Sequence, residues 1–265
     1  MIHPSAVVHP SVTVGESTWV GAFALVEEGV VLGQRCRIGE HAIVRTGSEL
    51  GDDCTVDSHA VVGGLPQMRN CALPTGRVRI GARSVLREGV TVNLPTKDGG
   101  QTVVGEDCML MANSHVGHDC VVGNQVTLAN NVMLAGHVEV GDGCFLGGGA
   151  GVHQFVRIGL GAMIGGNASI SYDVPPYSIA AERNEIRGLN VVGLRRSKVP
   201  LSVVADLKRC YHTVYGDGGG CLRQRAANAL AAVKCGSESH GRQFLDFFAS
   251  GQRGFARPRR GAAEA

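Results

Sequence analysis

The stretch VGEDCMLMANSHVGHDCVVGNQVTL occupies residues 104–128 and repeats an aliphatic residue at every sixth position: Val104, Leu110, Val116, Val122 and Leu128. The same period runs from Ile2 to Val62, resumes from Ile80 to Val92, and continues to Ile170. Glycine often follows the aliphatic residue directly, as a corner with positive φ or close backbone approach requires. A six-residue period predicts a parallel β-helix, with three short strands in each coil of about 18 residues.

The position two residues before each aliphatic residue holds a small side chain. Cysteine occupies this position five times: Cys36, Cys54, Cys108, Cys120 and Cys144. This placement predicts buried small hydrophobes rather than disulfides or metal ligands. Nine cysteines without a CxxC motif favour reduced thiols and a cytoplasmic setting. No 3.6-residue period appears before residue 180, which argues against a three-helix or doubly wound fold.

The repeat is interrupted twice, at residues 64–79 and 94–102. Both segments are predicted to be loops inserted into a coil, and loops on a rigid scaffold commonly carry binding residues. We expect the β-helix to span residues 1–182 and a smaller helical domain to span residues 183–265.

The C-terminal domain is predicted to contain three helices. Apolar residues at helical spacing indicate them: Val203, Leu207, Tyr211 and Val214; Leu222, Ala226, Leu230 and Val233; and Phe244, Leu245, Phe247 and Phe248. Residues from Gly251 onward are rich in Arg, Gly and Ala, and we expect them to fray.

The net charge of +2 conceals a split between the two parts of the chain. Residues 1–182 hold 10 Lys+Arg against 17 Asp+Glu, whereas residues 183–265 hold 15 against 6. This asymmetry indicates either an acidic partner for the C-terminal domain or a solvated, nonspecific basic end. The start lacks the pattern of a signal peptide and no apolar run reaches 18 residues. We therefore expect no stable membrane insertion, and we expect no nucleic-acid partner.

Residues 18 positions apart stack on successive coils of a β-helix. Four histidines therefore gather near one edge of three adjacent coils: His115, His118, His137 and His153. On this edge His118-Asp119 lies under Gly136-His137, which lies under Gln154-Phe155.

These residue types favour acyl transfer to a hydroxyl or an amine. Histidine titrates near neutral pH and can act as a general base, while Asp119 can hold the tautomer of His118. The N–H of Gly136 can stabilise an oxyanion. With no free nucleophile in view, direct transfer in a ternary complex is favoured. A zinc hydratase, which needs three converging ligands, and a non-catalytic scaffold are the alternatives.

Residues 111–120, Met-Ala-Asn-Ser-His-Val-Gly-His-Asp-Cys, resemble the signature of the acyl-carrier-protein–UDP-N-acetylglucosamine O-acyltransferase family, the first enzyme of lipid A synthesis. The resemblance extends over nearly the whole chain. Further matching segments are residues 128–131, 134–138, 152–155, 173–177 and 247–254.

The resemblance implies a homotrimer of left-handed β-helices, with active sites between subunits. We expect a cytoplasmic enzyme that uses no metal or cofactor. His118 would deprotonate the 3-hydroxyl of the sugar, Asp119 would orient His118, and the Gly136 N–H would stabilise the thioester oxyanion. Gly166 would lie near the floor of the acyl groove, and the basic C-terminal domain would meet the acyl carrier protein. Further residues implied to line the site are His115, His137, His153 and Gln154.

The departures from the family pattern concern the sugar nucleotide. Met68 and Asn70 stand where the family's first inserted loop offers Asp and Lys, and the segment after Asn93 lacks the family's arginine. In the C-terminal domain Asn190 and Arg196 remain, but a neighbouring Glu and a second Arg are lost. We expect UDP-N-acetylglucosamine bound in a different way, or a paralogue that acylates another nucleotide sugar, such as a 3-amino analogue, or uses acyl-CoA.

Overall fold

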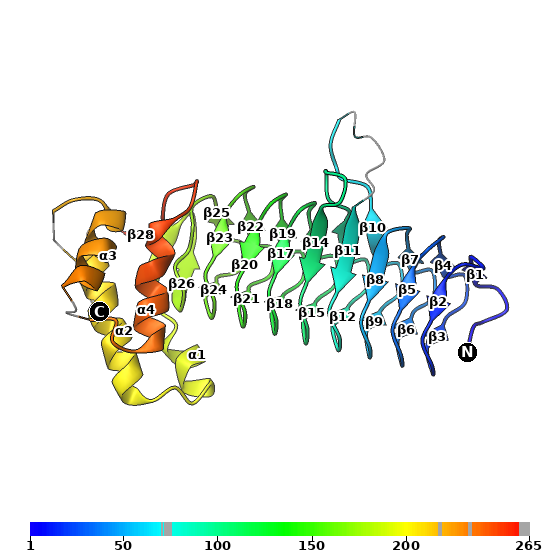
Figure 1. Ribbon diagram of the computed structural model, residues 1–265, viewed down its shortest axis with the longest axis horizontal. Helices are drawn as coiled ribbons and strands as arrows, with labels where there is room; N and C mark the ends of the chain where they lie inside the picture. The colour runs from blue at the N-terminus through cyan, green and yellow to red at the C-terminus, as the bar shows by residue number, and fades with distance from the viewer. Residues whose placement is uncertain (70, 72–75, 217–218, 233–234, 260–265) are drawn as a thin grey trace.

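The computed structural model describes residues 1–69, 71, 76–216, 219–232 and 235–259. Most of this chain forms a long prism of short strands, and helices gather at its C-terminal end (Figure 1). Successive coils pair in parallel along three sheets, which confirms the predicted parallel β-helix.

The three faces of the prism are three sheets, called I, II and III here. Sheet I contains nine strands: β1 (Val7–Val8), β4 (Leu25–Val26), β7 (Ile43–Val44), β10 (Val61–Gly64), β13 (Thr91–Asn93), β16 (His115–Val116), β19 (Met133–Leu134), β22 (Gly151–Val152) and β25 (Ser169–Ile170). Sheet II contains eight strands: β2 (Thr13–Val14), β5 (Val31–Leu32), β8 (Ser48–Leu50), β11 (Arg77–Ile80), β14 (Gln101–Val104), β17 (Val121–Val122), β20 (Glu139–Val140) and β23 (Arg157–Ile158). Sheet III contains eleven strands: β3 (Trp19–Val20), β6 (Arg37–Ile38), β9 (Thr55–Val56), β12 (Val85–Leu86), β15 (Met109–Leu110), β18 (Thr127–Leu128), β21 (Phe145–Leu146), β24 (Met163–Ile164), β26 (Ser178–Ala181), β27 (Glu185–Leu189) and β28 (Arg257–Pro258).

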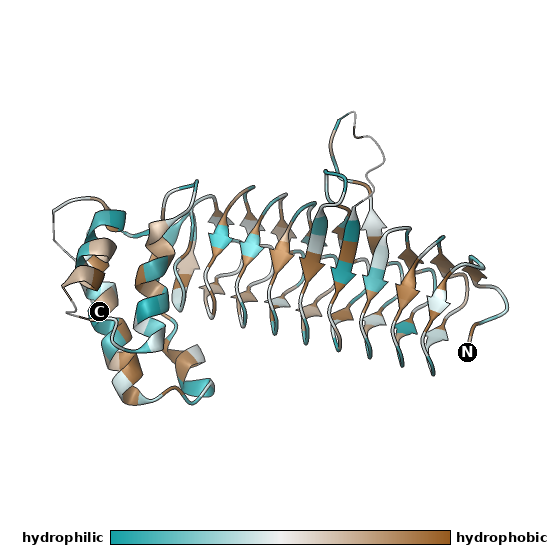
Figure 2. Ribbon diagram, viewed as in Figure 1, coloured by the Kyte–Doolittle hydropathy of each residue, from teal (hydrophilic) through white to brown (hydrophobic). Residues whose placement is uncertain are grey.

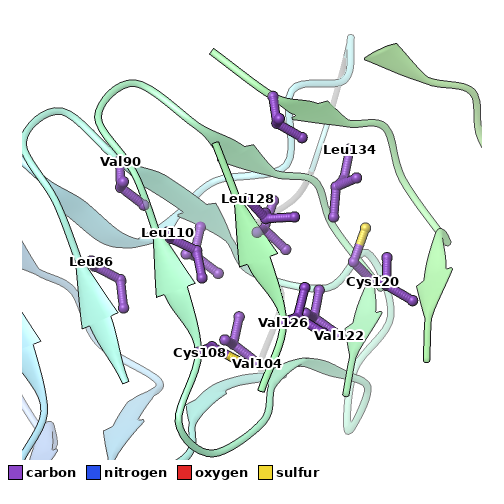
Figure 3. Close-up of a cluster of buried hydrophobic side chains, with 14 of the residues drawn as sticks. Leu86, Val90, Val104, Cys108, Leu110, Cys120, Val122, Val126, Leu128 and Leu134 are labelled. Atoms are coloured by element: carbon purple, nitrogen blue, oxygen red, sulfur yellow. The ribbon is translucent and has the colours of Figure 1, made fainter. Parts of the chain in front are cut away.

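The aliphatic residues of the six-residue period fill the interior of the prism. Leu86, Leu110 and Leu128 are fully buried and stack on successive coils (Figure 3). Because each side chain contacts its equivalent on the coils above and below, the core is continuous along the axis.

The five cysteines of the small inward position are buried and free, as predicted. Each thiol also donates a hydrogen bond to a turn carbonyl of the next coil, as Cys120 does to Ala135 O at 3.1 Å and Cys144 does to Gly159 O at 3.1 Å. Burial raises the pKa of both Cys120 and Cys144 to about 12. These thiols therefore brace the corners besides filling the core.

The C-terminal domain contains the three predicted helices, which are α2 (Leu201–Tyr215), α3 (Leu222–Ala231) and α4 (Ser239–Asp246), followed by the 3-10 helix η1 (Phe247–Ala249). Their apolar side chains form a shared core, and hydrophobic and hydrophilic residues alternate along the helices (Figure 2). Val233 lies outside the described residues. The sequence did not predict the short helix α1 (Val191–Arg196).

The expectation that the chain frays from Gly251 is wrong for the described residues up to 259. Gly251 and Gly254 adopt positive φ values of 109° and 75°, which let the chain turn back towards the prism. Asp173 N donates to Gly254 O at 2.9 Å, and β28 pairs with β27. Phe255 packs against Phe248, with 4.7 Å between ring centroids.

In the part of the chain that the structure describes, no helix combines the length and apolar character needed to cross a membrane.

Candidate active site

His118 and Asp119 lie at the corner where the chain turns from β16 in sheet I to β17 in sheet II. The Nδ1 atom of His118 lies 2.9 Å from Oδ2 of Asp119, and only 8% of His118 is exposed. Since a carboxylate accepts, Nδ1 of His118 carries the proton in this pair, and Nε2 is left with a lone pair. The geometry is that of an oriented histidine base.

Gly136 lies on the next coil, directly above the ring of His118. A Cβ atom at this position would stand 2.2 Å from Cε1 of His118, so a side chain would displace the imidazole. The N–H of Gly136 has no acceptor among the described residues. Glycine is thus needed here for steric reasons, and it leaves an unpaired donor beside the histidine.

A column of side chains continues along this edge through His137 and Phe155, as the 18-residue interval predicts. The rings of His137 and Phe155 are stacked at 4.6 Å, whereas His118 meets His137 edge-on at 5.1 Å. His137 Nε2 lies 3.7 Å from Asp119 Oδ2. Both histidines therefore face the same carboxylate.

The second inserted loop packs directly on Asp119. Thr96 donates to Asp119 Oδ2 through its backbone N–H at 3.1 Å and through its hydroxyl at 2.8 Å. The backbone N–H of Asp119 donates to the hydroxyl of the buried Thr102 at 2.9 Å. Neither Thr96 nor Thr102 is predicted from the sequence, where the break in the repeat is the signal that points to this loop.

The site sets the charge state of its members through burial and hydrogen bonding. Burial of Asp119 opposes its ionisation, but hydrogen bonds from His118 and Thr96 outweigh burial and hold its pKa below the usual value. Burial lowers the pKa of His137, and Asp119 offsets only part of this effect. Burial also lowers the pKa of His115, with a smaller contribution from the charge of His118. The carboxylate is therefore charged at neutral pH, and His115 and His137 are neutral.

A groove of about 690 Å³ runs along the outer face of sheet I beside this corner. His115, Met133 and Gly151 succeed one another in register on adjacent coils and line the groove. The Nδ1 atom of His115 lies 2.8 Å from the hydroxyl of Thr91. A Cβ atom on Gly151 would meet no atom within 4 Å, so this position leaves open space. Gly151 is not among the residues predicted from the sequence, although glycine in a strand often marks close approach of a ligand.

His153 and Gln154 lie at the same corner two coils beyond His118 and are exposed. Arg253, from the C-terminal segment, contacts both: its Nε donates to Gln154 O at 2.8 Å, and its guanidinium reaches Nδ1 of His153. No pattern in the sequence indicated this contact across about a hundred residues.

The predicted residues near the first inserted loop differ in their surroundings. Asn93 is 5% exposed, and its Nδ2 donates to Leu65 O at 2.8 Å, while its buried Oδ1 has no partner among the described residues. Met68 is 52% exposed. Asn70 lies outside the described residues. Asn93 thus anchors the base of the loop.

Three predicted site residues lie at other edges of the prism. Gly166 is in the turn between β24 and β25, where sheet III meets sheet I, and faces Gly148. Asn190 caps α1: its Oδ1 accepts from Gly193 N at 2.9 Å, and its Nδ2 donates to Gly161 O at 3.0 Å. Gly161 belongs to the edge between sheets II and III, and Arg196 lies in the last turn of α1. One chain therefore does not bring Gly166, Asn190 and Arg196 to His118.

One nitrogen each from His118 and His137 and one oxygen from Asp119 all lie within 4.8 Å of one another. Such a group could hold a metal ion after the rings turn. In the present arrangement Oδ2 of Asp119 already accepts from Thr96 and His118.

Family models match successive segments of the chain. Residues 11–46 and 101–136 match the bacterial transferase hexapeptide (six repeats), and residues 137–172 match the hexapeptide repeat of succinyl-transferase. Residues 173–256 match the second domain of UDP N-acetylglucosamine O-acyltransferase.

Solved structures resemble the chain over almost its whole length. The UDP-N-acetylglucosamine acyltransferase from Campylobacter jejuni is 34% identical, with a TM-score of 0.90 over 98% of this chain and 100% of that one. The chain belongs to the UDP-N-acetylglucosamine acyltransferase family. The UDP-N-acetylglucosamine O-acyltransferase from Moraxella catarrhalis is 31% identical, with a TM-score of 0.91 over 97% of this chain and 99% of that one. Membership of this acyltransferase family confirms the left-handed β-helix with a small helical domain.

Curated proteins named acyl-[acyl-carrier-protein]–UDP-N-acetylglucosamine O-acyltransferase match a shorter segment. The acyltransferase from Aquifex aeolicus is 36% identical over 89 residues, which are 33% of this chain and 33% of the relative. The acyltransferase from Sinorhizobium medicae is 40% identical over 97 residues, which are 36% of this chain and 34% of the relative. The match thus spans about a third of the length of these curated acyltransferases.

Proposed function

We propose that this protein transfers an acyl chain from acyl carrier protein to the 3-hydroxyl of UDP-N-acetylglucosamine, the first step of lipid A synthesis. The observation that carries the proposal is the pairing of His118 with Asp119 at 2.9 Å, beneath the Gly136 N–H, which has no acceptor among the described residues. Membership of the family supplies the substrate class, since related structures are named UDP-N-acetylglucosamine acyltransferases.

In the proposed reaction His118 is the general base. Its Nε2 takes the proton of the sugar hydroxyl as the hydroxyl oxygen attacks the thioester carbonyl carbon. Negative charge develops on the carbonyl oxygen, and the N–H of Gly136 stabilises it. The new C–O bond remains, the C–S bond breaks, and the proton passes from His118 to the thiolate of the carrier. Asp119 stabilises the imidazolium between the two proton transfers.

The groove on sheet I is the proposed site of the acyl chain. It adjoins the His118 corner through His115 and His153, and the exposed Met133 lines its middle. Gly151 leaves space for a ligand along this face. A Gly151→Leu variant should shorten the longest acyl chain accepted, without loss of rate on short chains.

The residues expected to bind the sugar nucleotide favour an acceptor held by fewer or different contacts than the family pattern provides. Met68 offers no charge, and the amide of Asn190 is already used by Gly193 and Gly161. A lost hydrogen bond to a charged group weakens binding by about 1.5–3 kcal/mol. A 3-amino nucleotide sugar, acylated on nitrogen, is therefore the acceptor to compare first.

We propose further that the active unit is a cytoplasmic homotrimer that receives its donor on the basic C-terminal domain. Residues assigned by the family resemblance to one site lie at different edges of a single chain, and neighbouring prisms packed side by side could bring such edges together. Exposed apolar side chains on the prism outside this groove support such packing: Val31 41%, Val121 47% and Phe145 41% exposed. The trimer is tested by measuring the mass in solution, and contact with the carrier by its salt dependence.

The test of the proposed reaction is acyl transfer followed by mass spectrometry. The acceptors are UDP-N-acetylglucosamine and its 3-amino analogue, each offered with plain and 3-hydroxyacyl carrier proteins of several lengths and with acyl-CoA. The proposal expects an acylated sugar nucleotide from the carrier thioester. No product from any pair, with a folded trimer, would contradict it.

A zinc hydratase is the second candidate, because His118, Asp119 and His137 cluster closely enough to converge on an ion. It predicts one zinc ion per chain and loss of activity with a chelator. The acyltransferase proposal predicts transfer at an unchanged rate after the protein has been dialysed against chelator.

A further inference from the structure

The C-terminal segment from Ser250 to Pro258, called the strap here, is held against the last coils of the prism by several independent contacts. Arg157 pairs with the buried Asp173 at 2.8 Å and donates to Ser250 O at 2.8 Å. Ala256 N donates to Asp173 O at 2.9 Å. These contacts fix the position from which Arg253 extends.

Arg253 meets the proposed site at two acceptors. Its Nε donates to the backbone carbonyl of Gln154 at 2.8 Å, and its guanidinium also contacts Nδ1 of His153. Nδ1 of His153 itself lies 3.4 Å from the same Gln154 carbonyl. The imidazole nitrogen and the carbonyl oxygen thus face each other, with the guanidinium across both.

The chemistry of arginine decides which tautomer of His153 fits this arrangement. Arginine only donates hydrogen bonds, so Nδ1 of His153 must present its lone pair and the proton must be on Nε2. Without the guanidinium, Nδ1–H could donate to Gln154 O, and the opposite tautomer would be favoured. Arg253 therefore favours the Nε2–H tautomer of His153, whereas the Gln154 carbonyl alone would favour the Nδ1–H tautomer.

We propose that Arg253 is a positioning residue that fixes His153 as the Nε2–H tautomer, so that His153 offers a hydrogen-bond donor to the sugar nucleotide. This inference rests on the proposed function for the identity of the ligand. It makes the strap part of the acceptor site, although nothing in the repeat itself requires it.

The test compares Arg253→Ala with Arg257→Gln, because Arg257 lies on the same strap, is exposed, and pairs through its backbone with Glu185. Nitrogen-15 NMR of histidine-labelled protein, with His153→Gln to assign the signal, reports which ring nitrogen carries the proton. We expect Nε2–H in the wild type and in R257Q, and a shift to Nδ1–H in R253A. An unchanged tautomer in R253A overturns the inference.

Steady-state kinetics supply the second readout. R253A should raise KM for the sugar nucleotide about tenfold, because His153 loses the Nε2–H that donates to the ligand, while kcat changes less. Added guanidinium ion should lower KM again, and sodium chloride of equal ionic strength should not. A tenfold fall in kcat with KM for the sugar nucleotide unchanged would contradict a role in acceptor binding. Because the NMR measurement needs no acyl transfer, failure of this inference and failure of the proposed function are distinguishable.

Discussion

Two columns of side chains run along different edges of the prism, and of these two only one contains the groups that an active site needs. Phe23, His41 and His59 stack along the edge between sheets III and I, with centroids 5.1 Å apart and ring planes within 17°. Asp119, His137 and Phe155 form the column between sheets I and II. All six residues occupy the same turn position, with φ between 58° and 64°.

The difference between the columns is the carboxylate at the base of the second one. In the first column every residue is an exposed ring stacked on another ring. In the second, Asp119 replaces a ring, and His118, one residue earlier, turns its Nδ1 towards it. The coil geometry thus places rings in stacks at equivalent turn positions. In the second column a carboxylate takes the place of one ring and, held by Thr96 of the inserted loop, orients His118 as a base.

The largest expected effect separates the two columns by activity. His118→Ala should lower kcat/KM by about 10²–10⁴, the usual contribution of a general base. His59→Ala, in the other column, should leave kcat/KM unchanged, because His59 has no carboxylate partner among its ring contacts. Equal losses in the two variants, measured by acyl transfer, would remove the distinction.

The next effect concerns the space above His118. Gly136→Ala should lower kcat about a hundredfold, because its Cβ would stand 2.2 Å from the imidazole and both the base and the oxyanion donor would move. Gly219→Ala is the matched control, since no atom lies within 4 Å of its Cβ position. A G136A protein with wild-type kcat would show that His118 needs no fixed position.

A smaller effect is expected from the loop that covers Asp119. Thr96→Val keeps the shape but removes the hydroxyl that donates at 2.8 Å, and should lower kcat about tenfold. In an Asp119→Ala background the same substitution should have no further effect, because the acceptor is gone. Additive losses in this double-mutant cycle would mean that Thr96 acts elsewhere.

The contribution of Asp119 to the free energy of unfolding should depend on pH. Its pKa is lowered in the folded protein, because hydrogen bonds from His118 and Thr96 outweigh the opposing burial. The ionised carboxylate therefore stabilises the fold above its unfolded pKa of about 3.9, and this contribution is lost as the pH falls through the folded value. Asp119→Asn should destabilise the protein more at pH 7 than at about pH 3 in urea unfolding. The same difference at both values would refute the assignment.

The smallest effect belongs to the first column. His41→Ala should change the free energy of unfolding by less than about 0.5 kcal/mol, as exposed substitutions usually do. A loss of several kcal/mol in thermal or urea unfolding would show that the ring stack is a structural support, and the first column would need another explanation.

The six-residue period predicted the fold and the neighbours of His118, because in a β-helix one interval sets every contact along an edge. The positions of Gly136, His137 and Phe155 relative to His118 follow from the interval of 18 residues per coil. Glycine at 136 could be assigned a role in advance for the same reason.

The sequence could not predict contacts that leave the repeat. Thr96 reaches Asp119 from an inserted loop, and Arg253 reaches His153 from a strap a hundred residues away. Neither distance is set by a period. Asn190, a candidate contact to the substrate, instead caps α1, because its local hydrogen bonds to Gly193 and Gly161 decide its orientation.

The most direct test of the central claim measures binding and transfer on the same preparation of His118→Ala. If His118 is the base of an otherwise intact site, the variant should bind UDP-N-acetylglucosamine with a Kd within about threefold of the wild type and yet form almost no acylated product. Loss of binding in proportion to loss of transfer, or transfer at the wild-type rate, would contradict the account.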